Sequence, residues 1–390
     1  MRDEMKKVPR LRFRGFSEEW EQCKLGDLGS VAMNKRIFKE QTSESGDIPF
    51  YKIGTFGATA DAFISRELFE TYKKKYPYPK IGDLLISASG SIGRVVEYKG
   101  NDEYFQDSNI VWLKHDDRIN NLFLKQFYSI VKWHGLEGST IKRLYNKNIL
   151  ETTIHLPVFD EQEKIGTLFK QLDDIITLHQ RKLEQLKELK KAYLQAMFVP
   201  TNVQNNKVPK LRFANFEGNW ELCKLENVID KHIKGKVKVE NLCNGSVEYL
   251  DANRLNGGKP IYTKALPDVS ERDIIILWDG SKAGKVYYGF KGVLGSTLKA
   301  YQLKECANSQ FIYQQLLDNQ NNIYNNYRTP NIPHVVKNFS SIFPIWMTSF
   351  EEQSQMADIL SNLDNRIILQ QNLTDTMISL KKSYLQNMFI

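Results

Sequence analysis

Cysteine and long apolar runs are scarce in this chain of 390 residues. The four cysteines, Cys23, Cys223, Cys243 and Cys306, show no C-x-x-C spacing, so neither a disulfide framework nor a structural zinc site is predicted. No window of about eighteen apolar residues occurs, and no apolar run follows the basic N-terminal stretch, which predicts neither a membrane span nor a signal peptide. These absences indicate a protein of the reducing cytoplasm without a membrane partner.

Motifs for catalysis are also absent. The chain lacks the Asn/Asp/Ser-Pro-Pro-Tyr/Phe motif of base methylation and the G-x-x-x-x-G-K-[ST] loop of ATP hydrolysis. The best enzymatic candidate is Asp83 followed by Glu97 and Lys99, an arrangement that can hold Mg²⁺ beside a phosphodiester. Because the second half of the chain keeps only the aspartate, as Asp273, we expect these to be ordinary strand residues and the chain to have no catalytic or metal-binding residues of its own.

Positive charge and aromatic residues are plentiful instead. The net charge is +8, charged residues make up 26% of the chain and aromatic residues 12%. This composition is typical of a globular protein. The surplus of lysine and arginine favours an anionic partner such as nucleic acid.

The sequence is internally duplicated. KVPRLRF begins at Lys7 and returns as KVPKLRF at Lys207, while KKAYLQAMF at 190–198 returns as KKSYLQNMF at 381–389. The offset therefore falls from 200 to 191 residues, so the interior of the first half is about nine residues longer. Two similar units, each large enough to bury a core, are predicted.

Each half begins with mixed β-structure. Residues 48–56 and 83–87 are short apolar runs bounded by Gly and Pro, as expected for buried strands. The second run leads into Ala88-Ser89-Gly90-Ser91 and a further strand, which predicts a hairpin or tight connection. The second half repeats this plan at 273–277, but its loop, WDGSKAGKV, is one residue longer and carries different side chains.

Each half ends in a long amphipathic segment. Apolar residues recur at helical steps over nearly forty residues, and Asp160 with Glu163, or Ser349 with Glu352, predicts each helix start. A helix of about 38 residues is roughly 57 Å long, too long for one small domain to cover. We expect the two apolar stripes to form a coiled coil. The alternative is that each helix folds back on its own domain.

The pairing should be antiparallel if a pseudo-twofold axis relates the halves. His179 and its counterpart Gln370 would then meet near the axis, where buried polar residues can fix the register. The predicted seam consists of Ile165, Leu168, Leu172, Ile176, His179, Leu183 and Leu186 in the first helix, and of Ile359, Leu363, Ile367, Gln370, Met377 and Leu380 in the second.

The duplicated P-x-L-R-F opening, the GDLLIS…GSIG loop and the helix entry LPVFDEQEKIGTLFKQLDDII together resemble the specificity subunit of type I restriction–modification systems over essentially the whole chain. The resemblance implies an α+β fold: two similar mixed α/β target-recognition domains joined by two long helices that form an antiparallel coiled coil. The implied boundaries are 1–158 and 201–348 for the recognition domains, 159–200 for the first helix with its linker, and 349–390 for the second helix.

The resemblance also implies a function. Each recognition domain would read one half of a bipartite site in double-stranded DNA, while the helices set the spacing and dock two methyltransferase subunits. S-adenosylmethionine would bind to those subunits, and ATP with Mg²⁺ to restriction (motor-nuclease) subunits, so the specificity subunit itself would hold no cofactor. The departures in WDGSKAGKV and MTSFEEQ suggest that the second domain reads a different half-site.

Two other functions stay open: a stand-alone nucleic-acid-binding protein and a non-catalytic protein scaffold. An exposed second stripe on the helices, including Phe169, Phe198 and Phe389, would indicate docking of further subunits. Burial of these three rings against their own domain is the alternative.

Residues that read or position DNA should lie on Gly-punctuated loops and carry polar or basic groups. The candidates in the first half are Lys35, Arg36, Lys52, Ser89, Ser91, Arg94, Lys142 and Arg143. Those in the second half are Lys234, Lys236, Asn253, Arg254, Asp279, Ser281, Lys282, Lys285, Arg328 and Asn331.

Overall fold

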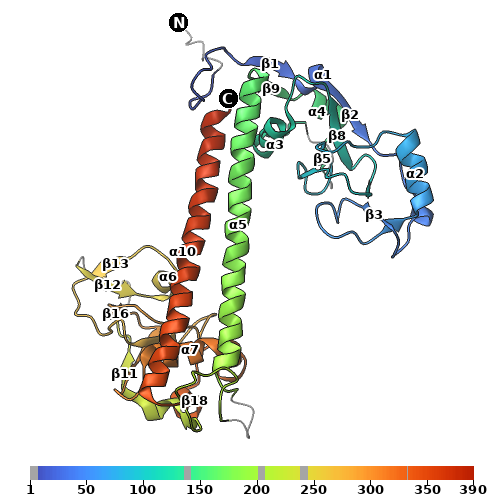
Figure 1. The fold of residues 1–390 in the computed structure, drawn as a ribbon. Coiled ribbons are helices and arrows are strands. Elements are labelled where there is room, and N and C mark those ends of the chain that lie inside the picture. Colours follow the sequence, from blue (N-terminus) through green and yellow to red (C-terminus); the bar gives the residue numbers. More distant parts are fainter. Residues whose placement is uncertain (1–7, 136–141, 201–206, 238–244, 332) are drawn as a thin grey trace. The chain divides into compact units, whose positions relative to one another are not determined.

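The computed structural model describes residues 8–135, 142–200, 207–237, 245–331 and 333–390 (Figure 1). Cys243 lies outside the described residues, and so do residues 139–141, which precede the candidates Lys142 and Arg143. The chain divides into two compact units. Unit 1 comprises Met1–His179 with Leu373–Ile390, and unit 2 comprises Gln180–Asn372, so each unit contains one recognition half and about half of each long helix.

The recognition half of unit 1 is built on a four-stranded antiparallel sheet, β2-β8-β5-β6, beside a three-stranded sheet, β4-β3-β7. A third sheet consists of the two strands β1 and β9, and β9 leads into the long helix α5. The elements are β1 (Glu21–Lys24), α1 (Leu25–Leu28), β2 (Gly29–Met33), η1 (Lys39–Gln41), β3 (Ile48–Tyr51), β4 (Phe63–Ile64), α2 (Arg66–Lys75), β5 (Leu84–Ser87), β6 (Val95–Glu97), β7 (Tyr104–Phe105), β8 (Ile110–His115), α3 (Asn121–Ile130), α4 (Asn146–Leu150), β9 (Thr153–Leu156) and α5 (Phe159–Met197).

Unit 2 repeats this topology with sheets β11-β17-β14-β15, β13-β12-β16 and β10-β18. The predicted duplication and the predicted strands at 83–87 and 273–277 are confirmed. The strand predicted at 48–56 is shorter, because β3 ends at Tyr51 and a turn follows. The elements are β10 (Glu221–Lys224), η2 (Leu225–Val228), β11 (Ile229–Lys234), β12 (Val247–Leu250), α6 (Ala252–Leu255), β13 (Ile261–Thr263), β14 (Ile274–Leu277), β15 (Val286–Tyr287), β16 (Val293–Leu294), β17 (Leu298–Leu303), α7 (Ser309–Asp318), α8 (Gln320–Asn326), α9 (Phe339–Ile342), β18 (Pro344–Met347) and α10 (Phe350–Met388).

The largest difference in length between matching connections lies between β4 and β5, while other connections differ by one to three residues in either direction. Between β4 and β5 lie nineteen residues (65–83), whereas between the matching strands β13 and β14 lie ten (264–273). The difference of nine equals the fall in the repeat offset from 200 to 191. The longer connection of unit 1 contains α2, and the matching connection of unit 2 has no helix.

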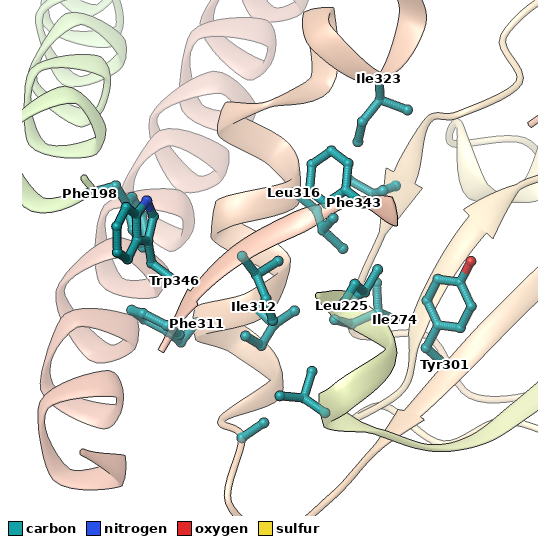
Figure 2. Packing of buried hydrophobic residues seen from close by; sticks show 14 of the residues in the cluster. Phe198, Leu225, Ile274, Tyr301, Phe311, Ile312, Leu316, Ile323, Phe343 and Trp346 are labelled. Carbon is teal, nitrogen blue, oxygen red and sulfur yellow. The ribbon is translucent and has the colours of Figure 1, made fainter. Parts of the chain in front are cut away.

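In the core of each unit, aromatic residues from the start of a half pack against a residue of the repeated segment that ends a long helix. In unit 1, Trp20 packs edge-on against Phe123 of α3 and against Phe389 of the segment 381–389, with ring centroids 5.9 and 6.2 Å away. In unit 2, Trp220 packs in the same way against Phe311 and Phe198. Figure 2 shows Phe198 beside Phe311 and Trp346 in this core.

The repeated P-x-L-R-F segment joins the end of one helix to the start of the other. In unit 1, the backbone N–H of Leu11 donates to the carbonyl of Asn387 near the end of α10, and Arg12 forms a two-pronged ion pair of 2.7 and 2.8 Å with Glu161 at the start of α5. The Leu11 bond satisfies one of the carbonyls that a helix end leaves unpaired. Glu161 is fully buried, so this ion pair is both desolvated and geometrically strong.

Unit 2 has the same connection, here called the strap (Leu11 and Arg12 in unit 1, Leu211 and Arg212 in unit 2), with the roles of the two helices exchanged. The Leu211 N–H donates to the carbonyl of Ala196 near the end of α5, and Arg212 pairs with Glu352 at the start of α10 through two bonds of 2.8 Å. The duplication therefore extends to individual hydrogen bonds.

The glutamine after each of these glutamates ties the helix to the recognition half. Gln162 accepts a bond from the Asn120 N–H at the start of α3 and donates to the carbonyls of Arg118 and Pro157. Gln353 makes the matching bonds to Asn308, Cys306 and Thr348. In each helix start the glutamate thus holds the P-x-L-R-F segment, and the glutamine next to it holds the recognition half.

The long helices run antiparallel within each unit (Figure 1). In unit 1, Phe169 meets Phe389 and, one turn further along α5, Asp173 pairs with Lys381 at 2.6 Å, so α10 runs in the opposite direction. In unit 2, Lys190 pairs with Asp364 at 2.5 Å. These two ion pairs are the same pair repeated at an offset of 191 residues.

The buried seam follows a seven-residue repeat, as in left-handed coiled coils. Most predicted seam residues are buried or half-buried, and Leu168, His179, Ile359, Ile367 and Met377 are among the half-buried ones. The prediction is wrong for Leu380, which is exposed: in that part of α10 Thr374 is buried and Lys381 is half-buried, and these two residues lie on the seam instead. Sequence reasoning missed the seam positions Phe169, Lys190, Leu360, Thr374 and Lys381. The meeting of His179 with Gln370 stays a prediction.

Two further expectations need comment. Ser349 caps α10 as predicted, accepting a bond from the Glu352 N–H, but α5 begins at Phe159 with Val158 in the equivalent place, so Asp160 lies inside the first turn. Phe169 and Phe198 are buried and Phe389 packs on Trp20, so these rings do not form an exposed docking stripe. The alternative is correct for Phe169, but Phe198 packs on Trp220 of the second half and Phe389 on Trp20 of the first, so these two rings are covered by the other half of the duplication.

Replacing Arg12 by alanine should destabilise unit 1 by about 3 kcal/mol, because it leaves the Glu161 carboxylate buried without a partner. The matched control is Arg14→Ala, since Arg14 is exposed and the second repeat carries Ala214 at that position. Urea unfolding midpoints measure both effects. Equal midpoints for the two variants would contradict a structural role for the strap.

Acid should weaken the strap of unit 2. Burial by itself raises the pKa of Glu352, but hydrogen bonds from Arg212 and Thr348 outweigh it and hold the pKa below its usual value. The stabilisation is therefore present at neutral pH and is lost as the pH falls through that lowered pKa. Thermal melting of the wild type and of Glu352→Gln across acidic pH should show a smaller pH dependence in the variant, and parallel curves would refute this.

Candidate nucleic-acid interface

The Gly-punctuated loop after β5 has a backbone frame that glycine makes possible. The Arg94 N–H donates to the Ser87 hydroxyl at 2.9 Å, and that hydroxyl donates in turn to the Ser91 carbonyl. Gly90 and Gly93 adopt left-handed backbone angles, with φ of 63° and 82°. A Cβ on Gly93 would lie 2.7 Å from the Trp133 ring nitrogen, so a side chain there has no room.

This loop places a polar cluster at one edge of the four-stranded sheet of unit 1. Arg143 forms a β-bridge with Ser89, and its guanidinium donates to the Ser108 hydroxyl at 2.9 Å and to the Asn109 side chain at 3.2 Å. Ser89 donates to the same Asn109 oxygen at 2.8 Å. Among the described residues no carboxylate pairs with Arg143, so its charge is oriented by neutral groups and stays uncompensated.

The other candidates of unit 1 surround this cluster to different extents. Ser91 and Arg94 lie on the same loop, Arg94 donating to the Phe56 carbonyl at 2.6 Å, and Lys142 is exposed next to Arg143. Lys52 and Arg36 are tied to Asp61 and Asp107 at 2.9 and 3.1 Å. Lys35 is held elsewhere, with its ammonium 5.3 Å from the centre of the Tyr76 ring.

Unit 2 has a cluster in the matching place. Asp279 forms a β-bridge with His334, and the Val335 N–H donates to the Trp278 carbonyl. The Arg328 guanidinium donates to the Ser281 carbonyl at 3.2 Å and lies over the Tyr324 ring. Four of the predicted residues, Asp279, Ser281, Lys282 and Arg328, therefore lie around one loop.

A lysine that sequence reasoning missed adjoins this loop. The Lys299 ammonium lies 3.2 Å from the centre of the Trp278 ring. Partial burial, and then the nearby charge of Lys234, lower the pKa of Lys299. An aromatic face beside a partly desolvated ammonium is suited to contact with nucleic acid.

The remaining candidates of unit 2 are more dispersed. Lys285 donates to Asn256 at 2.5 Å, and Arg254 pairs with Glu248. The exposed side chains are Lys234, Lys236, Asn253 and Asn331. Lys234 lies at the end of β11, opposite Lys299 in the strand register, whereas Asn253 and Arg254 lie in α6.

Sequence reasoning also missed Ser108, Asn109, Thr297 and His334. Asn109 and Thr297 join the cluster through strand pairing between segments far apart in the chain, and no local motif announces such contacts. Trp278 did carry a signal, because a large aromatic residue in a Gly-rich loop after a buried strand is unusual.

The possible magnesium site is not assembled. Glu97 is paired with Lys99 at 2.7 Å and with Lys125 at 3.2 Å, and Asp83 instead accepts a bond from the Lys80 N–H. Burial raises the pKa of Glu97, but these lysines outweigh it and lower the pKa overall. Within the described ranges, no group of three or more His, Cys, Asp or Glu side chains could hold a metal ion.

The family model of the type I restriction modification DNA specificity domain matches this chain twice, at residues 17–188 and 217–377. The chain therefore belongs to the family of type I restriction–modification specificity proteins. Within the segments that the structure describes, no helix is long and apolar enough to cross a membrane.

Relatives agree with this assignment. The chain is 55% identical over 152 residues to a protein of Haemophilus influenzae named as a type I restriction enzyme specificity subunit, a match that covers 39% of this chain and 40% of that protein. It is 32% identical over 180 residues to the MjaVIII specificity subunit of Methanocaldococcus jannaschii, covering 44% and 42%. The chain thus matches about two fifths of the length of either relative.

A solved structure supports the fold. The crystal structure of the S subunit of a type I restriction–modification system from M. genitalium superposes with a TM-score of 0.71 at 16% identity, covering 98% of this chain and 99% of that one. At this identity the likeness concerns the fold alone.

Gly93→Ala should destabilise unit 1 by about 2 kcal/mol or more, because it adds a collision with Trp133 to the strain of a left-handed backbone. Gly90→Ala is the matched control: its φ is also positive, but the nearest side-chain atom lies 3.5 Å away, so a loss of about 1 kcal/mol is expected. Urea unfolding compares the two. Equal losses would show that the Trp133 contact does not constrain the loop.

Proposed function

We propose that this chain is the DNA-recognition subunit of a type I restriction–modification complex, and that each unit reads one half of a bipartite site in double-stranded DNA. The observation that carries the proposal is a loop frame common to both units that presents different side chains in each. Membership of the specificity family supports it.

The common frame is visible in matched backbone bonds. The Ala88 N–H donates to Asn109 in unit 1, as the Trp278 N–H donates to Thr297 in unit 2, and the Leu144 N–H donates to Ala88 as Val335 does to Trp278. On this frame the side chains differ: Ser89 stands opposite Arg143, and Asp279 opposite His334.

These differences suit two unlike half-sites. A guanidinium such as that of Arg143 can donate two parallel bonds to the O6 and N7 of guanine, whereas a carboxylate such as that of Asp279 accepts from the amino group of cytosine. Two modules combine their discrimination, because each correct contact contributes about 1 to 3 kcal/mol. The helices add a distance requirement, since 39 residues span about 58 Å.

The helices also offer matched docking points for partner subunits. Leu178 and its counterpart Leu369 are 64% and 68% exposed, and Leu189 and Leu380 form a second matched pair of exposed residues. Exposed apolar residues on a helix favour a protein partner. Two equivalent sets support two methyltransferase subunits, one for each unit.

Chemistry then belongs to the partners. We infer that S-adenosylmethionine binds to the methyltransferase subunits and ATP with Mg²⁺ to the restriction subunits, and that this chain acts in the cytoplasm without a cofactor or catalytic residues of its own.

Modified-base sequencing of cells that express this chain with its methyltransferase subunit tests the proposal. We expect methyl-adenine at a split motif with a fixed gap, and its loss when this chain is absent. Exchange of residues 201–348 for those of a relative should change only one half of the motif. Unchanged methylation would leave a stand-alone nucleic-acid binder or a protein scaffold as the better account.

Single substitutions sharpen this test. Arg143→Ala should relax one half of the motif and Asp279→Ala the other, each weakening discrimination at one position by about ten- to a hundredfold. Lys191→Ala, an exposed change on α5, is the control. If both substitutions altered the same half, the assignment of one half-site to each unit would be wrong.

A further inference from the structure

The extra connection of unit 1 carries a cluster of lysines. Helix α2 ends in Lys73, Lys74 and Lys75, and it lies within the nineteen-residue stretch that is nine residues longer than its counterpart in unit 2. The duplicated frame is complete in unit 2 without these nine residues, so the scaffold does not need them.

Helix α2 is firmly seated. Ser65 caps its first turn, and Phe69 is fully buried in a core with Ile48 and Phe50 of the three-stranded sheet. Asp102 pairs with Arg66 at 3.0 Å and with Lys73 at 3.3 Å, which neutralises that side of the helix. The position of the remaining lysines is therefore set by a packed element.

Lys75 of α2 and Lys35, from a segment outside the helix, contact the same aromatic ring. The ammonium groups of Lys75 and Lys35 lie 5.7 and 5.3 Å from the centre of the Tyr76 ring. The backbone at Lys35 is held in turn, because the Tyr104 hydroxyl donates to the Lys35 carbonyl at 3.0 Å. Two positive charges, at most 11 Å apart from these distances, are thus gathered on one surface.

No carboxylate balances these charges among the described residues. The ion pairs of α2 and its surroundings involve Arg66 and Lys73, and none includes Lys35, Lys74 or Lys75. Like charges repel, so an arrangement that gathers them without an acid favours an external anion.

A short chain of contacts links Lys35 to the cluster around Arg143 in unit 1. Lys35 precedes Arg36, which pairs with Asp107 at 3.1 Å, and the next residue, Ser108, accepts a bond from Arg143. Phosphates next to a duplex bound at Arg143 are therefore the external anion that we expect for Lys35 and Lys75.

We propose that Lys35 and Lys75, with Lys74 beside them, bind backbone phosphates of the duplex next to the first half-site, as a sequence-independent anchor that unit 2 lacks. This inference rests on the proposed function and adds a role to it. Lysine suits phosphate as a mobile point charge, whereas base reading favours groups that form paired hydrogen bonds, such as that of Arg143.

Salt dependence of binding tests the anchor. The binding constant K of the full chain is measured over a range of salt concentrations, for the wild type and for Lys35→Ala/Lys75→Ala. One duplex carries the motif that modified-base sequencing identifies, and a second duplex carries a scrambled sequence. Each lost phosphate contact lowers the slope of log K against log salt by about 0.9, so the slope should fall by about 1.8 on both duplexes. The preference for the motif over the scrambled duplex should stay unchanged.

Two variants serve as controls. Lys182→Ala/Lys191→Ala removes the same charge from exposed positions of α5 and should leave the slope as in the wild type. Lys35→Arg/Lys75→Arg keeps the charge and should keep the slope. A wild-type slope in the alanine variant, or a changed motif preference, would overturn the anchor. Absence of any motif preference in the wild type would instead refute the proposed function.

Discussion

The rest of each unit depends on one buried ion pair. It joins the arginine of the P-x-L-R-F segment to a glutamate in the first turn of a long helix. Arg12 grips Glu161 in unit 1, and Arg212 grips Glu352 in unit 2. The neighbouring leucine caps the end of the other helix, so one short segment fixes the relation of two helix ends. A desolvated, two-pronged pair tolerates few other geometries, which explains why both partners recur in both repeats.

This constraint also sets the position of the loops that carry the candidate interface residues. The glutamine next to each buried glutamate bonds to the segment before α3 or α7, and these helices pack against the tryptophan at the start of each recognition half. The sheet then carries the loop after β5 or β14 to its edge. Many backbone and side-chain bonds of the scaffold are repeated, while the side chains on the loops differ, so these side chains can vary without a change in the fold.

Much of this architecture was predictable, because repetition and helical periodicity are written in the order of residues. The two units, the central strands, the antiparallel helices and most of the seam came from these patterns. Leu380 was misplaced because apolar character favours leucine over Lys381, although Lys381 occupies the seam by pairing with Asp173. The start of α5 was misplaced because a plausible capping residue, Asp160, follows the true start at Phe159.

The sequence by itself determined the duplication, the two long amphipathic helices and the nine-residue asymmetry, since each is a property of residue order. Only the tertiary structure decided which polar side chains form the candidate interface, because Ser89, Asn109 and Arg143 are brought together by strand pairing across distant segments. It also placed Lys35 beside Lys75 on one tyrosine ring, a contact between a loop and a helix some forty positions apart that no local pattern encodes.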